Sequence, residues 1–359
     1  IVFFFFSYNE MLTIKIPEID KHRNETTFRP WLSKWEMFRD IGIKFIFEGK
    51  RFDMLWIGQA SYMLKSKLHA ESVEFGLKNL NRLVPLGSDF VMFDGQDSAS
   101  LMGTYEVYKR LDNKPLKFLK NSLYKNPNDY TRPSPHGRTY WDKNSEINFH
   151  LIDHAQLDGV ELSNTNWLST VTPNWFRYKG ANKDIDVFAM FGCESSENWE
   201  FSSRTDFYYD HHRKKCLNWL DMLPKNIKVA RLSNGIKVPI EEYYSLMSRS
   251  KIVIAPFGYG EMAPRDIEAA SIGAILVKPD MSHLKSSPFP YIPHNTYVPV
   301  KWDYSDLNET ILNLLENYAY NQEFFVENMR QEYAKQYAPQ KLVMETYNWI
   351  SKLEGYGTT

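Results

Sequence analysis

The clearest pattern in the chain is an alternation, in its second half, between short apolar runs and stretches with apolar residues every three or four positions. The apolar runs have the length of buried strands and lie at 186–191, 228–232, 251–255 and 274–277. The stretches between them have helical spacing, as where Cys216, Leu217 and Leu220 fall on one face. Strands that alternate with amphipathic helices indicate a parallel sheet covered on both faces.

Breaker residues and spacing set the expected limits of the helices in this half. Helices are predicted at 206–223, from 239, at 264–273 and at 307–318, with a helical tail at 321–353 and a last short strand at 297–300. A parallel sheet binds ligands in the loops that follow the carboxyl ends of its strands. We therefore expect a site in the loops after Phe191, Ala255 and Val277.

The first half has a similar but less regular pattern. Strands are predicted at 52–57, 90–93 and 116–120, with a helix at 71–83. Pro173 and the segment 179–182 interrupt the pattern between the halves. The sequence therefore predicts an α/β protein of two Rossmann-like domains, an N-terminal one at 1–178 and a C-terminal one at 179–359 that includes the helical tail.

The segment 250–277 contains the most specific chemistry. A buried strand enters a loop with Gly258 and Gly260, where the backbone can approach a ligand closely, and the loop opens a helix at Pro264. The N–H groups at a helix start suit a diphosphate, and Arg265 adds a fork for phosphate oxygens. Glu268 lies three residues later on the same face, where its carboxylate can accept both hydroxyls of a ribose. The simpler interpretation is an i,i+3 surface ion pair beside two ordinary turn glycines.

This segment resembles the donor-binding signature of exostosin-like GT-B glycosyltransferases. The resemblance rests on Pro-Arg-Asp-Ile-Glu-Ala at 264–269, on Gly273 with the strand that follows it, and on the preceding segment 247–256. In that family the arginine contacts the donor diphosphate and the glutamate holds the nucleotide ribose, which implies these roles for Arg265 and Glu268. It also implies two Rossmann-like domains that face each other across a cleft.

The sequence departs from related patterns at two places. Gly-Ala-Ile-Leu stands at 273–276, where the family usually has Gly-Cys-Val-Pro. Glu261 and Glu268 are one residue closer than the paired glutamates of many retaining GT-B enzymes. These departures leave the subfamily and the stereochemistry open. We count Glu261 among the donor-binding residues, together with Asp280 in the loop after the strand at 274–277. Asp280 or His283 could touch the donor sugar or its phosphates, and a capped surface loop is the alternative.

An inverting transferase needs a base that takes a proton from the acceptor hydroxyl. In a GT-B enzyme this base often belongs to the N-terminal domain. Asp94 and Asp97 follow the predicted strand at 90–93, and Asp97 is the preferred candidate. The alternative is that Asp94 starts a turn and Asp97 caps a helix.

Other polar motifs point less clearly to chemistry. Asp184 and Asp186 resemble the D-x-D metal motif of GT-A enzymes, but they precede a strand rather than follow one. The GT-B resemblance implies neither a metal nor a cofactor beyond the nucleotide-sugar. His211 and His212 fall on different helix faces and cannot easily chelate one ion. Arg204 and Arg213 are candidate phosphate contacts, although surface charge is the default interpretation.

Composition excludes some classes of function. The net charge of −1 gives no global attraction to nucleic acid. Two cysteines cannot form a disulfide framework or a complete zinc site. The N-terminal run Ile-Val-Phe-Phe-Phe-Phe is too short to span a bilayer and reads as a first strand cut at its start. We expect a cytoplasmic or membrane-peripheral protein, with an upstream anchor left open.

Together these features predict a glycosyltransferase that moves a sugar from a nucleotide-sugar donor to a hydroxyl of a glycan or glycoconjugate. The expected reaction is metal-independent and inverting, with an aspartate base. A GT-B-like epimerase or phosphorylase, and a glycan- or nucleotide-binding module without turnover, remain as alternatives. The sequence does not identify the donor sugar, the acceptor or the oligomeric state.

Overall fold

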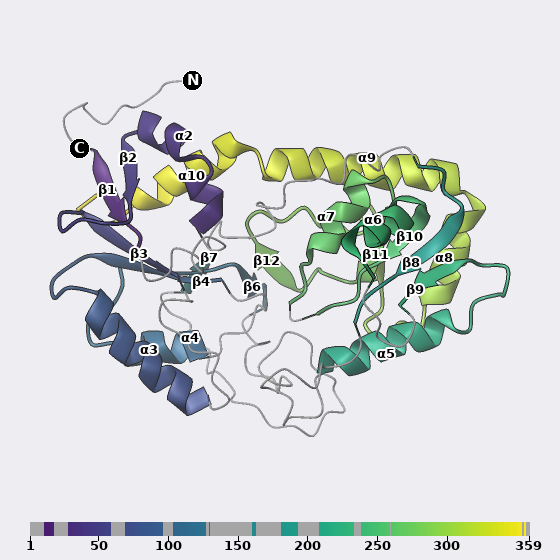
Figure 1. Ribbon diagram of the computed structural model, residues 1–359, viewed down its shortest axis with the longest axis horizontal. Coiled ribbons are helices and arrows are strands. Elements are labelled where there is room, and N and C mark those ends of the chain that lie inside the picture. Colours follow the sequence, from purple (N-terminus) through teal and green to yellow (C-terminus); the bar gives the residue numbers. More distant parts are fainter. Residues whose placement is uncertain are drawn as a thin grey trace.

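The computed structural model contains two parallel β-sheets, one formed by each half of the chain (Figure 1). It describes residues 11–17, 28–58, 69–95, 103–126, 129, 160–162, 181–192, 208–232, 238–258, 260–353 and 355–356. Within these residues every neighbouring pair of strands inside the two large sheets is parallel. The α/β class predicted from the sequence is confirmed.

The first sheet has six strands in the order β2-β1-β3-β4-β5-β7. They are β1 (Leu12–Lys15), β2 (Ile43–Ile46), β3 (Met54–Gly58), β4 (Phe90–Asp94), β5 (Lys117–Lys120) and β7 (Val160–Leu162). Its helices are α2 (Trp35–Asp40), α3 (His69–Leu83) and α4 (Gly103–Arg110). Every residue of β3 and β4 is buried, as expected for central strands covered on both faces.

The second sheet has five strands in the order β13-β11-β10-β8-β9. They are β8 (Ile185–Ala189), β9 (Val229–Arg231), β10 (Ser250–Ile254), β11 (Ile275–Pro279) and β13 (Val298–Val300). The helices are α5 (Tyr208–Leu220), α6 (Ile240–Ser248), α7 (Pro264–Ser271), α8 (Leu307–Glu316) and α9 (Tyr318–Gln336). Each predicted strand and helix of this half is present, with ends shifted by a few residues.

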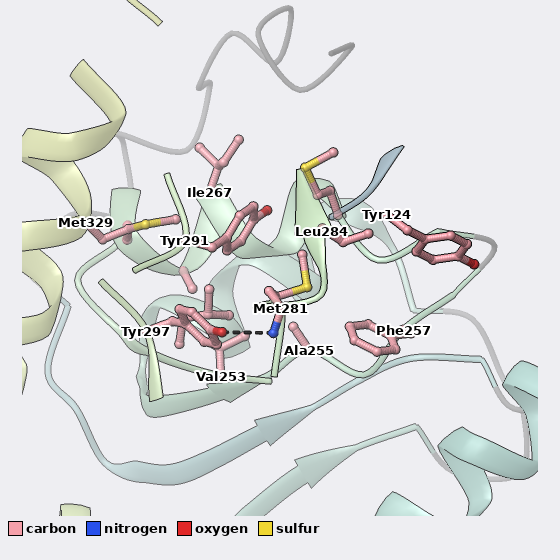
Figure 2. Packing of buried hydrophobic residues seen from close by; sticks show 14 of the residues in the cluster. Tyr124, Val253, Ala255, Phe257, Ile267, Met281, Leu284, Tyr291, Tyr297 and Met329 are labelled. Carbon is pink, nitrogen blue, oxygen red and sulfur yellow. Dashed lines mark hydrogen bonds between the residues drawn. The ribbon is translucent and has the colours of Figure 1, made fainter. Parts of the chain in front are cut away.

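A short antiparallel pair joins the two halves. It consists of β6 (Ser122–Tyr124) and β12 (Leu284–Ser286), which lie between the large sheets in Figure 1. One buried apolar cluster includes side chains from both halves, among them Tyr124 and Leu284 (Figure 2). In the same cluster the backbone N–H of Met281 donates to the hydroxyl of Tyr297 at 2.9 Å. The two sheets are therefore connected by continuous packing as well as by the chain.

The helical tail returns to the first sheet. It divides into α9 and α10 (Pro339–Ile350), because a proline disfavours helix at the residue before it and suits the first helical turn. In α10, Thr346 accepts a hydrogen bond from the Trp31 indole at 2.8 Å, and Trp349 lies 5.5 Å from the Trp56 ring. The end of the segment 179–359 thus packs in the core of the first sheet. The boundary expected near residue 178 lies outside the described residues.

We expect Thr346→Val to destabilise the protein through this contact. Valine keeps the shape of threonine, but the fully buried indole N–H of Trp31 loses its acceptor, which costs about 1–3 kcal/mol. Met344, on the same helix, is 54% exposed, so Met344→Ala is the control. Urea unfolding of both variants measures the effect, and equal stability of the two would contradict this account of the tail.

Candidate functional site

The predicted loop and helix lie at the carboxyl end of the second sheet. After β10, the backbone N–H of Gly258 donates to the carbonyl of Gly260 at 3.0 Å. Ala263 is extended, and Pro264 occupies the first turn of α7. The carboxylate of Asp266 accepts the backbone N–H of Ala263 at 3.1 Å, as an acid in the first turn of a helix can.

At Gly258 the loop lies close to a side chain that the sequence did not identify. A Cβ at this position would lie 2.6 Å from Nη2 of Arg213, so a side chain would displace that guanidinium. Arg213 comes from α5 and donates to the carbonyls of Phe257 at 3.0 Å and Gly192 at 2.6 Å. Of the two candidate phosphate contacts, Arg213 therefore lies just beyond the end of β8, against the glycine loop, and Arg204 lies outside the described residues.

Arg265 and Glu268 do not form the surface ion pair that the sequence left open. Arg265 donates to the carbonyl of Met190 at 3.0 Å and to the hydroxyl of Tyr243 at 3.2 Å. Glu268 is only 6% exposed and accepts hydrogen bonds from Tyr243 at 3.4 Å and Tyr244 at 3.1 Å. Burial raises the pKa of Glu268, against the opposing effect of Arg265. Both side chains are thus held in fixed positions at the edge of the sheet.

Two guanidinium groups lie over one aromatic ring at this edge. The Cζ atoms of Arg265 and Arg213 are 5.8 Å and 6.0 Å from the centroid of Phe191, the second residue after β8. Guanidinium groups stack on aromatic faces, and their forked N–H groups match the oxygens of a phosphate. With the N-terminus of α7 beside them, they form a region suited to a phosphate group.

A buried ion pair under the loop was not predicted from the sequence. Lys278, at the end of β11, donates to the Asp266 carboxylate at 2.5 Å and to the carbonyl of Glu261 at 2.7 Å. Tyr291 donates to the same Asp266 oxygen at 2.7 Å. The side chains of Lys278 and Asp266 are both fully buried. A lysine at the end of an apolar run was the available signal, because such a residue is rarely buried unless it is paired.

Glu261 is buried without a hydrogen-bond partner among the described residues. It is 1% exposed, and Nε2 of His283 lies 3.9 Å from its carboxylate. Burial raises the pKa of Glu261, with His283 acting in the opposite direction. The His283 ring lies 4.9 Å from Trp302 and 6.2 Å from Tyr124 of the first half. The structure therefore brings Glu261 and His283 together where the two halves meet.

The remaining predicted residues have other surroundings. Asp280 accepts a hydrogen bond from the backbone of Ser282 at 3.0 Å, within its own loop, and one from the hydroxyl of Tyr297, directly before β13, at 3.3 Å. Asp94, at the end of β4, is fully buried and 3.3 Å from Nζ of Lys120 at the end of β5. Asp97 lies outside the described residues.

The D-x-D-like aspartates are engaged at the opposite end of the second sheet. Asp184 accepts from Arg249 at 2.8 Å, and Asp186 accepts from Lys251 at 2.6 Å. Among the residues that the structure describes, no three His, Cys, Asp or Glu side chains gather as they would around a metal ion. In the same part of the chain, every helix is too short or too polar to cross a membrane.

Comparison with solved structures establishes the fold. The chain is similar to the sucrose-phosphate synthase of Thermosynechococcus elongatus, with a TM-score of 0.51 and 11% identity over 94% of this chain and 98% of that one. The chain has a GT-B fold. It is also similar to Anabaena HepE in complex with UDP-glucose, with a TM-score of 0.46 and 9% identity over 95% of this chain and 100% of that one. No protein-family model and no curated protein matches the sequence.

We expect Glu261→Gln to stabilise the protein at neutral pH. Below the ordinary value of 4.5, the carboxyl is protonated in the folded and unfolded chains, and its charge has no effect on stability. As the pH rises above this value, the unfolded chain releases its proton first, because burial raises the pKa in the folded state. The wild type then loses about 1.4 kcal/mol for each unit by which that pKa is raised, and glutamine avoids this loss.

The measurement is urea unfolding of the wild type and of Glu261→Gln between pH 4 and pH 8. The stability difference should grow with pH. Glu316→Gln is the control, because Glu316 is exposed on α8. A difference that does not change with pH would show that the Glu261 carboxyl is not perturbed by burial.

Proposed function

We propose that this protein is a glycosyltransferase that moves a sugar from a nucleotide-sugar donor to a hydroxyl of a glycan or glycoconjugate. The observation that carries the proposal is the arrangement of Arg265 and Glu268 at the start of α7. Both side chains are fixed by hydrogen bonds at the carboxyl edge of the second sheet of a GT-B fold. The exostosin-like resemblance of residues 264–269 gives the same two residues the same roles.

In this proposal the donor lies along the carboxyl edge of the second sheet. Each oxygen of Glu268 accepts a hydrogen bond from one phenol and keeps a second lone pair. The carboxylate can therefore also accept hydrogen bonds from the ribose hydroxyls. Arg265, in the first turn of α7, binds the diphosphate. It also stabilises the negative charge that the diphosphate gains as the bond to the sugar breaks. Gly258 and Gly260 let the backbone approach the phosphates.

The sugar and the acceptor then lie toward the first sheet. We assign Glu261 and Asp280 to the sugar end of the donor. An aspartate that follows β4 acts as the base, and the reaction inverts the configuration at the sugar carbon without a metal. Asp97 suits this role better than Asp94, because Asp94 is buried and paired with Lys120. The base takes the proton from the acceptor hydroxyl, whose oxygen attacks the sugar carbon as the diphosphate leaves.

Thermal unfolding with a panel of nucleoside diphosphates and their sugars tests the donor site. A ligand that binds only the folded state at 100 times its Kd adds about 2.7 kcal/mol of stability. We expect one nucleotide series to raise the midpoint of the wild type and of Glu323→Gln, an exposed control on α9, but not that of Glu268→Gln. If no nucleotide raises the midpoint of the wild type, the proposed donor site is wrong.

Turnover separates a transferase from a binding module. The nucleotide-sugar that stabilises the protein is incubated with hydroxyl acceptors, and release of the nucleoside diphosphate is measured. Arg265→Ala should lower the rate by about 10²-fold or more, because it removes charge stabilisation in the transition state. Donor binding without release at any acceptor would favour a nucleotide-binding module.

A further inference from the structure

The hydroxyl of Tyr243 lies between the two principal groups of the proposed donor site. Tyr243 is on α6, and Arg265 and Glu268 are on α7. Its oxygen accepts from Nε of Arg265 at 3.2 Å and donates to Glu268 at 3.4 Å. No ion pair within 4.0 Å joins Arg265 directly to Glu268 in the described structure, so this hydroxyl links them.

The direction of the two hydrogen bonds is fixed by the chemistry of the groups. A guanidinium can only donate, and an ionised carboxylate can only accept. Burial raises the pKa of Tyr243 to about 12, so its proton is present at neutral pH. The chain of bonds therefore runs from Arg265 through the phenol to Glu268. Hydrogen bonds in such a chain polarise and strengthen one another.

The ring of Tyr243 is held independently of its hydroxyl. Phe188 of β8 packs against it edge to face at 5.1 Å, and Tyr244 packs against it at 5.3 Å. Removal of the hydroxyl alone should therefore leave the ring in place. Tyr244 offers a matched comparison, because it also donates to Glu268, at 3.1 Å, but makes no hydrogen bond to Arg265 among the contacts of these described residues.

We infer that Tyr243 is a positioning residue that couples recognition of the nucleoside to recognition of the diphosphate. The inference rests on the proposed function, in which Glu268 holds the ribose and Arg265 the diphosphate. A ribose bound at Glu268 holds the carboxylate in the orientation that accepts from Tyr243. The Tyr243 hydroxyl in turn holds Nε of Arg265 in the orientation that suits the diphosphate. By linkage, a diphosphate bound at Arg265 favours ribose binding by the same factor.

Three probes separate the two halves of the site in a calorimetric experiment. The affinity for uridine measures binding at Glu268, the affinity for pyrophosphate measures binding at Arg265, and the affinity for UDP measures both together. The adenosine and guanosine series are measured in parallel. Tyr243→Phe should weaken pyrophosphate and nucleoside binding by about 3–10-fold each, since one hydrogen bond is lost on each side. Tyr244→Phe should weaken nucleoside binding by a similar factor and leave the affinity for pyrophosphate unchanged.

A second variant tests the coupling without changing the tyrosine. Arg265→Lys keeps the positive charge but removes the Nε donor to Tyr243. We expect it to weaken nucleoside binding by about 3-fold or more, although the nucleoside carries no phosphate. In the Tyr243→Phe background the same change should leave nucleoside binding unaffected, because the link is already absent.

The outcomes distinguish this inference from the proposed function. If no nucleoside diphosphate binds the wild type, both are wrong. If UDP or another nucleotide binds the wild type and Tyr243→Phe behaves like Tyr244→Phe on all three probes, the coupling is wrong and the donor site stands. The melting midpoints of the ligand-free variants control for folding. Should Tyr243→Phe unfold, Arg265→Lys decides the question: unchanged nucleoside affinity would overturn the inference.

Discussion

The carboxylate of Asp266 is the interaction on which the arrangement of the site depends. It is fully buried and accepts hydrogen bonds from the ammonium of Lys278, the hydroxyl of Tyr291 and the backbone N–H of Ala263. These donors belong to the end of β11, to the segment after β12 and to the start of α7. A buried charge that loses one partner is destabilised by about 3–5 kcal/mol. The position of α7 relative to the sheet is therefore strongly fixed.

Because α7 is fixed, its neighbours can carry groups that are costly to bury. Lys278 also holds the carbonyl of Glu261, whose side chain is buried with no hydrogen-bond partner among the described residues. Glu268 is nearly buried as well, with two phenols in contact with its oxygens. Unsatisfied or weakly solvated carboxylates of this kind persist where the surrounding structure over-determines their position, and such positions cluster at functional sites.

The sequence predicted the second half of the chain well, because its periodicity is regular and prolines and glycines mark the ends of its elements. It predicted the first half less well. Several strands of three or four residues were not predicted, among them β1, β2 and β6 of that half, and β12 of the second. A pattern this short is distinguished only where the regular alternation around it continues, as it does at β9. At the site, Arg265 and Glu268 followed from their spacing. The role of Tyr243 could not be predicted, because its contacts with Arg265 and Glu268 depend on how α6 packs beside α7.

The return of α10 to the first sheet has a consequence for how the protein is made. Trp31 and Thr346, which share a buried hydrogen bond, are 315 positions apart in the chain. During synthesis the first sheet emerges from the ribosome long before α10 does, and domains generally fold as they emerge. Trp31 and Trp56 therefore lack their contacts with α10 until the second sheet has been translated. Until α10 has been made, the apolar side chains of the first sheet that contact it are a surface that a chaperone can protect.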